Sequence, residues 1–365
     1  MTPRLEVRDL TKTFNIRRRG HGGSGKILAV DGVSLAIAPG ETLGLVGESG
    51  CGKSTLGRTI VGLYRADQGE ILIDGTPRVS GDPELPRHVQ MVFQDPYTSL
   101  PPKMRVGTIV AEPLLIHHIV AKQQVAERVE QLLASVGLKP EHALAFPSQL
   151  SGGQRQRVGI ARALAVEPSV IVADEPVSAL DVSVQAQILN LLKDLQEEHG
   201  ISLLFVSHDL GVVRYMSHRV AVMYLGRIVE TGTAADIVDD PLHPYTRTLL
   251  AAVPSVERGR RDEPLIDVDP PNPASPPSGC AFHPRCPHVE QQCRDERPPF
   301  VEWRTDRPVA CHLVDQIAST SGRSATGDGG EATSHPKAGT KAGGTTTADT
   351  TAADTSANDT TGAQS

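Results

Sequence analysis

Apolar residues recur in two distinct patterns over the first two thirds of the chain, one typical of strands and the other of helices. Compact apolar runs predict buried strands at residues 42–46, 70–73, 89–93, 170–173 and 201–206. Looser alternation predicts edge strands at residues 4–14 and 27–37, with a Gly- and Arg-rich loop at 17–26 between them. Residues 219–225 and 228–231 predict the two strands of a hairpin.

Apolar residues at helical spacing fill the segments between these strands. The spacing is helical from about residue 106 to residue 164, and again from Val184 through Ile188 to Leu195. Strands that alternate with helices predict an α/β core of parallel strands, here with an antiparallel edge subdomain and a helical insertion at about 95–168.

The composition changes after residue 254. Pro and charged residues dominate 254–279, which predicts a linker, and residues 280–312 hold four of the five cysteines. Residues 319–365 are nearly all Thr, Ala, Gly, Ser and Asp, with too little apolar surface to offset the entropy of ordering. We therefore expect a large α/β domain at 1–255, a Cys-rich C-terminal extension at 256–318 and a disordered tail at 319–365.

The net charge is −7 and the aromatic fraction is 3%, so neither a basic field nor a base-stacking surface favours a nucleic-acid partner. The first residues lack the apolar core of a signal peptide, and no apolar run reaches the length of a membrane span. These features predict a cytosolic chain, in which cysteines are more typical of metal ligands or lone thiols than of disulfides.

A glycine-rich segment joins the predicted strand at 42–46 to a helical pattern at Leu56, Ile60, Leu63 and Tyr64. Its residues fit the phosphate-binding pattern G-x-x-x-x-G-K-[ST]: Gly47, Glu48, Ser49, Gly50, Cys51, Gly52, Lys53, Ser54 and Thr55. Backbone N–H groups and the positive end of a helix suit a polyphosphate. We expect Lys53 to reach the β- and γ-phosphates, and the Ser54 hydroxyl to bind Mg²⁺.

Two later segments indicate which class of phosphate-loop protein this chain belongs to. The strand at 170–173 ends in Asp174, which would hold Mg²⁺ and its water, and Glu175, which is placed to polarise an attacking water. Leu150, Ser151, Gly152, Gly153 and Gln154 open a helix and form a second anion-binding helix end. Two such ends in one chain make sense if two chains meet head to tail and complete each other's sites.

With these motifs the chain resembles the ATP-binding subunit of an ABC transporter over residues 4–255, which implies a P-loop NTPase core of the ABC type. Residues 150–154 resemble the signature motif of that family. The resemblance implies ATP and Mg²⁺ as cofactors. It also implies roles for four further residues: Gln94 as the Q-loop glutamine that senses Mg²⁺ and the membrane partner, Phe14 as the ring stacked on adenine, Asp181 in the D-loop, and His208 at the γ-phosphate.

Residues 243–246 and 276–312 resemble the C-terminal extension of oligopeptide, dipeptide and nickel importer ATPases, most closely the second, F-type ATPase of the pair. This implies an ATPase that dimerises with itself or a paralogous subunit beneath two transmembrane permease subunits, on the cytoplasmic face of the cell membrane. It would drive import of peptides brought by an extracytoplasmic solute-binding protein. One departure is Leu100-Pro101-Pro102-Lys103, where the family usually has Leu-Asn-Pro-Arg.

Other functions remain open at this point. The ATPase of a nickel or oligosaccharide importer would look the same, because the solute never touches this chain. A soluble ABC ATPase of DNA repair or translation usually adds tandem cassettes, coiled coils or basic patches, none of which is evident. A regulatory subunit that binds ATP without hydrolysis would lack Glu175, His208 or the full signature.

Four cysteines of the extension, Cys280, Cys286, Cys293 and Cys311, have the spacing C-x₅-C-x₆-C-x₁₇-C. Four thiolates suit tetrahedral zinc or an iron–sulfur cube, and the spacing is standard for neither. The resemblance of residues 279–287 to the family extension favours a [4Fe–4S] cluster, with Zn²⁺ or metal-free thiols as alternatives. Cys51, inside the phosphate loop, is not expected to be a ligand.

Overall fold

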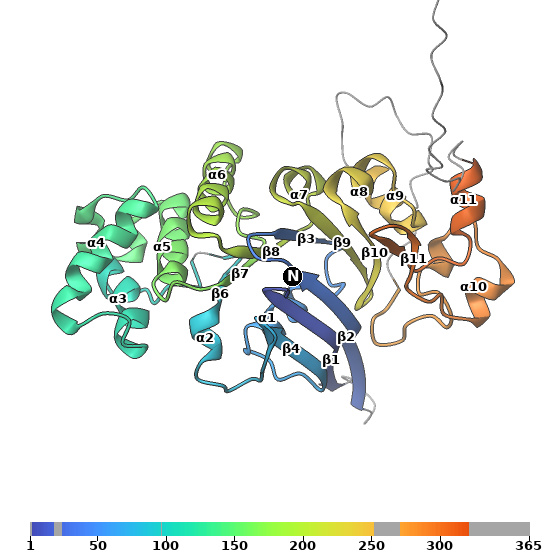
Figure 1. Ribbon diagram of the computed structural model, residues 1–365, viewed down its shortest axis with the longest axis horizontal. Coiled ribbons are helices and arrows are strands. Elements are labelled where there is room, and N and C mark those ends of the chain that lie inside the picture. The colour runs from blue at the N-terminus through green and yellow to red at the C-terminus, as the bar shows by residue number, and fades with distance from the viewer. Residues whose placement is uncertain (1, 18–23, 96, 252–270, 321–365) are drawn as a thin grey trace, which may run out of the picture. The chain divides into compact units, whose positions relative to one another are not determined.

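Two β-sheets form the framework of the computed structural model, which describes residues 2–17, 24–95, 97–251 and 271–320 (Figure 1). The smaller sheet has the order β2-β1-β4-β5 and the larger the order β11-β12-β10-β9-β3-β8-β7-β6. The smaller sheet consists of β1 (Leu5–Arg17), β2 (Ser24–Ile37), β4 (Gln68–Ile73) and β5 (Thr76–Arg78). The larger sheet consists of β3 (Thr42–Val46), β6 (Val89–Val92), β7 (Val170–Asp174), β8 (Ser202–Ser207), β9 (Arg219–Tyr224), β10 (Arg227–Thr233), β11 (Val301–Arg304) and β12 (Arg307–Val309).

The pairing confirms an α/β core. β3 runs parallel to both β8 and β9, and β7 runs parallel to both β6 and β8. β9 and β10 form the predicted antiparallel hairpin. All pairs of the smaller sheet are antiparallel, as expected of the edge subdomain.

Helices cover the larger sheet and complete the helical insertion (Figure 1). They are α1 (Lys53–Ile60), α2 (Leu85–His88), α3 (Val106–Ile116), α4 (Val125–Ser135), α5 (Gly152–Leu164), α6 (Val182–His199), α7 (Leu210–Met216), α8 (Ala234–Asp239), α9 (Pro244–Ala251), α10 (Gln291–Asp295) and α11 (Val314–Thr320). Short 3₁₀ turns lie at Lys122–Gln124, Pro140–Leu144, Pro147–Gln149 and His283–Arg285.

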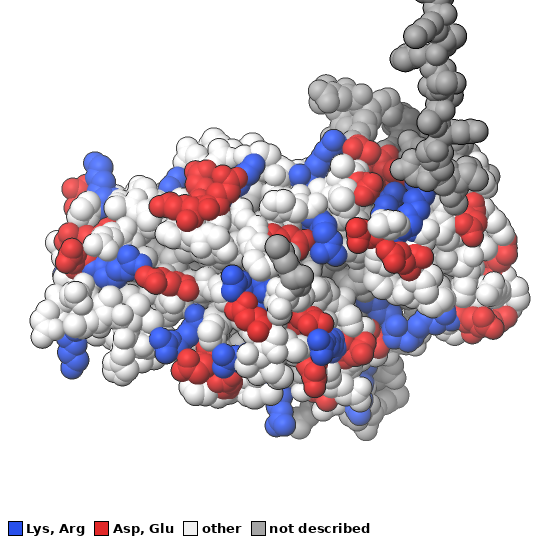
Figure 2. Space-filling model, in the orientation of Figure 1, with Lys and Arg blue, Asp and Glu red and all other residues white. Residues whose placement is uncertain are grey.

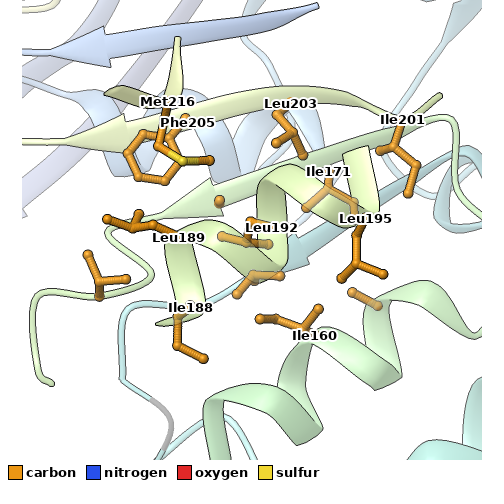
Figure 3. Close-up of a cluster of buried hydrophobic side chains, with 14 of the residues drawn as sticks. Ile160, Ile171, Ile188, Leu189, Leu192, Leu195, Ile201, Leu203, Phe205 and Met216 are labelled. Atoms are coloured by element: carbon orange, nitrogen blue, oxygen red, sulfur yellow. The ribbon is translucent and has the colours of Figure 1, made fainter. Parts of the chain in front are cut away.

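Both faces of the central strands β3, β7 and β8 are buried, which explains why these strands are nearly continuous apolar runs. In β8, Leu203 and Phe205 belong to one hydrophobic cluster, and Leu204 and Val206 belong to another. Figure 3 shows the first cluster, in which side chains of α6 such as Leu192 lie against the strands. The second cluster joins the opposite face to α1 and to the smaller sheet.

Some predicted boundaries are wrong. The expected helical face ran to Tyr64, but α1 ends at Ile60, because Gly62 takes a φ of 79° that ends the helix, and Leu63 is exposed. The strands flanking the predicted loop at 17–26 reach Arg17 and begin again at Ser24, so they occupy part of that loop.

The C-terminal extension continues the core sheet. β12 pairs antiparallel with β10, where Glu230 faces Val309, and β11 then pairs with β12. Its own apolar clusters are small, one around Leu242 and Val309 and one around Cys293 and Ile317. Residues 254–270 of the predicted linker and residues 321–365 of the predicted tail lie outside the described residues, whereas residues 319 and 320 end α11.

Basic and acidic side chains are interspersed over the face shown in Figure 2. Within the described part of the chain, no helix combines the length and the apolar character that a bilayer span requires.

Candidate nucleotide-binding site

The glycine-rich loop lies between the end of β3 and the start of α1. Gly52 caps α1 with a φ of 111°, a conformation that side chains rarely adopt. A Cβ at Gly52 would lie 2.1 Å from the Ala29 carbonyl oxygen of β2. The second glycine of the motif is therefore required both by backbone conformation and by the close approach of β2.

Lys53 is buried inside this loop, with 4% of its surface exposed. Its Nζ donates to the carbonyl oxygens of Gly47, at 2.7 Å, and Glu48, at 3.0 Å. The ammonium group is thus held at the centre of the loop by neutral acceptors, where its charge suits an anionic ligand.

Ser54 and Asp174 meet across the end of the sheet. The Ser54 Oγ donates to Asp174 Oδ1 at 2.8 Å. Asp174 Oδ2 is buried without a hydrogen-bond partner, and the Arg58 guanidinium is 4.0 Å away. Burial raises the pKa of Asp174, since a charged carboxylate is costly away from water. A buried carboxylate oxygen beside a hydroxyl fits Mg²⁺, which prefers oxygen ligands.

Gln94, Glu175 and His208 follow the neighbouring strands β6, β7 and β8 and converge at one point. Gln94 Nε2 donates to Glu175 Oε2 at 2.9 Å, and His208 Nδ1 lies 3.4 Å from Glu175 Oε1. Glu175 has a φ of 47°, a strained value for a residue with a side chain. The convergence follows from parallel pairing, which brings the carboxyl ends of these strands to one edge of the sheet.

These groups share a cleft of about 420 Å³. Loop residues 49–55 line it together with Gln94, Glu175 and His208. The remaining lining residues come from β2, from the turn between β9 and β10, and from the extension: Ile27, Leu28, Ala29, Leu225, Gly226 and Pro273. The cleft therefore combines a phosphate-binding loop, a fitting Mg²⁺ position and a carboxylate in reach of a water.

Among the described residues, Gly47, Glu48 and Asp174 do not line this cleft themselves, and neither do three predicted elements: the signature segment 151–154, Asp181 and Phe14. Ser151 caps α5, accepting from Gln154 N at 3.2 Å, while Gln154 Oε1 accepts from Ser151 N at 2.9 Å. Asp181 is exposed at the start of α6. The Phe14 ring packs edge-to-face on Tyr64, with centroids 5.2 Å apart. Stacking of Phe14 on adenine stays a prediction.

The chain is similar in sequence to known proteins over most of its length. The family model described as ABC transporter matches residues 30–178. The oligopeptide transport ATP-binding protein AppF of Bacillus subtilis is 48% identical over 318 residues, covering 85% of this chain and 97% of that protein. The chain belongs to the ABC transporter family.

The match extends beyond the ABC core. A second family model, described as the C-terminal region of oligopeptide/dipeptide transporters, matches residues 229–293. The oligopeptide transport ATP-binding protein OppF of Escherichia coli is 47% identical over 325 residues, covering 86% of this chain and 97% of that protein. The di/tripeptide transport ATP-binding protein DppF of Pseudomonas aeruginosa is 46% identical over 318 residues, covering 86% and 98%.

A solved ABC cassette confirms the fold. The dimeric, post-hydrolysis structure of the cassette MJ0796, bound to ADP and Pi, has a TM-score of 0.55 at 32% identity. The structural match covers 63% of this chain and 98% of the MJ0796 chain. ATP and Mg²⁺ are accordingly the cofactors expected of this ABC protein.

The structure adds contacts to the ABC site that the sequence did not indicate. The hydroxyl of Tyr245 accepts from the backbone N–H of Glu48 at 2.8 Å. Arg285 donates two hydrogen bonds to the Glu48 carboxylate, each 2.9 Å. The only signal in the sequence was the carboxylate itself, which is unexpected in an anion-binding loop.

The cysteines of the ABC extension do not form a ready metal site. Among the described residues, which include all five free thiols, no group of three or more His, Cys, Asp or Glu side chains is arranged to hold a metal ion. The predicted [4Fe–4S] cluster and its zinc alternative are therefore not supported by the geometry. Cys280, Cys293 and Cys311 nonetheless share one small cluster with Leu313 and Ile317.

Proposed function

We propose that this chain is the ATP-hydrolysing subunit of an ABC importer for peptides. The observation that supports it best is the cleft that the phosphate loop shares with Glu175, with buried Asp174 hydrogen-bonded to the Ser54 hydroxyl of that loop. Peptide as the solute rests on the oligopeptide/dipeptide model over 229–293 and on relatives named for oligopeptide and di/tripeptide transport. That C-terminal region also disfavours a soluble ABC ATPase of DNA repair or translation. Nickel or oligosaccharide import stays an alternative, since the solute does not contact this subunit.

The polar residues in and beside the cleft then have roles in ATP hydrolysis. The backbone of residues 47–55 and the buried Lys53 ammonium hold the β- and γ-phosphates. Mg²⁺, held by Ser54 and Asp174 with Gln94 nearby, would neutralise charge on the phosphate oxygens. Glu175 orients the attacking water and accepts its proton, and His208, 3.4 Å from Glu175, contacts the γ-phosphate.

A second chain would complete the site. Ser151, Gly152, Gly153 and Gln154 form the N-terminal end of α5, and none of them lines this chain's own cleft, which supports their action on the nucleotide of an opposite subunit. The partner is a second copy or a paralogous ATPase, with Asp181 at the junction of the two sites. The dimer would work on the cytoplasmic face of the membrane beneath two permease subunits, with a solute-binding protein outside. ATP closes the dimer, and hydrolysis opens it.

We also propose a structural metal in the extension, bound by Cys280, Cys286, Cys293 and Cys311, as a [4Fe–4S] cluster with Zn²⁺ as the alternative. Three of these thiols lie in one cluster. Burial raises the pKa of Cys286 to about 11 and that of Cys311 to about 12, so metal binding would have to displace their protons. The extension would also have to rearrange to gather the four sulfurs around a metal. Its two apolar clusters are small, which is typical of segments that depend on a metal to fold.

Glu175→Gln tests the proposed hydrolysis. The amide oxygen of Gln can still accept from Gln94, so the fold and ATP binding should be retained, while the proton acceptor is lost. We expect the turnover number to fall by about 10²–10³-fold or more. The matched control is Glu198→Gln at the exposed end of α6, which should leave turnover unchanged. Hydrolysis by Glu175→Gln at the rate of the control would show that Glu175 is not the catalytic base.

A further inference from the structure

The second residue of the phosphate loop carries a negative charge close to the place where a polyphosphate must bind. Every polar group of this residue, Glu48, takes part in a hydrogen bond. Its backbone N–H donates to the Tyr245 hydroxyl at 2.8 Å, and its carbonyl oxygen accepts from Lys53 Nζ at 3.0 Å. Its carboxylate accepts two hydrogen bonds from Arg285, each 2.9 Å.

The ion pair between Glu48 and Arg285 is well shielded from water. The Arg285 side chain is 5% exposed and that of Glu48 is 24% exposed. Two parallel hydrogen bonds between a guanidinium and a carboxylate form the most directional ion pair that side chains make. Both partners are thereby fixed, although they lie 237 residues apart in the chain.

Arg285 is positioned by an aromatic cluster beneath the loop. It ends the short turn His283–Arg285, directly after Phe282, which is fully buried. The Phe282 ring centroid lies 5.4 Å from that of Tyr224 and 5.5 Å from that of Tyr245. Tyr245, on α9, accepts a hydrogen bond from the Glu48 backbone, so α9 and the extension both contact the loop through residues next to or within one aromatic cluster.

We propose that Arg285 is a positioning residue for ATP: it neutralises the Glu48 carboxylate and holds the phosphate loop in its binding conformation. The proposal deepens the proposed function and rests on it. Without the guanidinium, the charge of a partly buried carboxylate on the phosphate loop would repel the phosphates bound by the same loop. The C-terminal extension is then part of the nucleotide site.

The experiment is calorimetric titration of the full chain with ATP. Arg285→Gln keeps a polar side chain of moderate size but removes the charge, and should raise the Kd for ATP about tenfold, as expected for the loss of one charge-assisted contact. Adding Glu48→Gln to that variant removes the uncompensated carboxylate, and should return the Kd to within about threefold of the wild-type value. Arg285→Lys keeps the charge and should also stay within about threefold.

Arg297→Ala is the matched control. Arg297 lies in the same extension, but its side chain is 59% exposed and approaches Asp31 only to 3.7 Å. Arg297→Ala removes one positive charge from the extension without changing a contact to the phosphate loop, so the Kd of this variant for ATP should equal that of the wild type. Fluorescence of Trp303, the single tryptophan of the chain and part of β11, reports whether the extension is folded in each variant.

Failure of the chain to bind ATP can be distinguished from failure of Arg285 to position the loop. A wild-type chain that does not bind ATP would overturn the proposed function itself. If the wild type binds and Arg285→Gln binds as tightly as Arg297→Ala, Arg285 does not position the loop. If the double variant, or Arg285→Lys, is as weak as Arg285→Gln, charge neutralisation is wrong and Arg285 acts only through the fold. Recovery in both variants supports the proposal.

Discussion

The turn that leads into α9 makes the stability of the protein depend on pH through one buried histidine. His243 is 2% exposed, its Nδ1 accepts from Tyr245 N at 3.0 Å, and its ring lies 5.8 Å from that of Phe282. Burial lowers the pKa of His243 from 6.5 to about 3, and a hydrogen bond to the Ala310 backbone opposes only part of this. We therefore expect His243 to stay neutral in the folded protein at pH values where the unfolded chain is protonated.

The size of the effect follows from the two pKa values. The unfolded chain takes up a proton near pH 6.5 and the folded chain only near pH 3, so the unfolded state binds more protons between them. The free energy of unfolding therefore falls as pH is lowered through this window, by about 1.4 kcal/mol for each pH unit. At about pH 5, His243 alone should lower the free energy of unfolding by about 2 kcal/mol.

Urea unfolding followed by Trp303 fluorescence, at about pH 7 and about pH 5, measures this loss. His243→Gln can still accept from Tyr245 N and cannot titrate, so its loss on acidification should be smaller by about 2 kcal/mol. The comparison between variants is needed because burial raises the pKa of the neighbouring Glu230, which gives the opposite pH dependence. The control is the exposed His199→Gln, which should behave as the wild type. Equal losses in the wild type and His243→Gln would refute the reasoning.

Two further predictions concern the signature helix and the cysteines. Ser151→Arg should abolish ATP-driven dimerisation in size-exclusion chromatography and leave the ATP affinity of the monomer unchanged, because Ser151 does not line its own cleft; a large loss of monomer affinity would place both motifs on one nucleotide. Protein purified without oxygen should be brown, with about four irons and four sulfides per chain, and Cys286→Ser should bleach it and expose 280–312 to protease. Colourless protein with one zinc per chain would exclude the iron–sulfur cluster, and protein without metal and with an unchanged protease pattern would exclude both metals.

The elements that carry the chemistry could be predicted because their signals are local. The phosphate loop needs particular glycines within a few residues of each other, and Gly52 shows why, since it combines a φ of 111° with a close carbonyl. Buried strands such as β7 and β8 can be recognised in the sequence as apolar runs, and Asp174 and Glu175 directly follow such a run. The meeting of Gln94, Glu175 and His208 was available from the family resemblance and agrees with the parallel order of β6, β7 and β8.

The tertiary structure decided what joins these local pieces. No periodicity or spacing links Glu48 to Arg285, because their pairing depends on how the extension docks after β12 adds to β10. Likewise, the family resemblance implied a role for Phe14 at adenine, and only the tertiary structure showed that its ring packs against Tyr64. The spacing of the cysteines could not reveal whether four thiols face one point, since that depends on the backbone between them. Sequence alone determined the catalytic motifs and the strands that present them. Long-range packing, whose energy is summed over many weak contacts, determined that the C-terminal extension holds the phosphate loop.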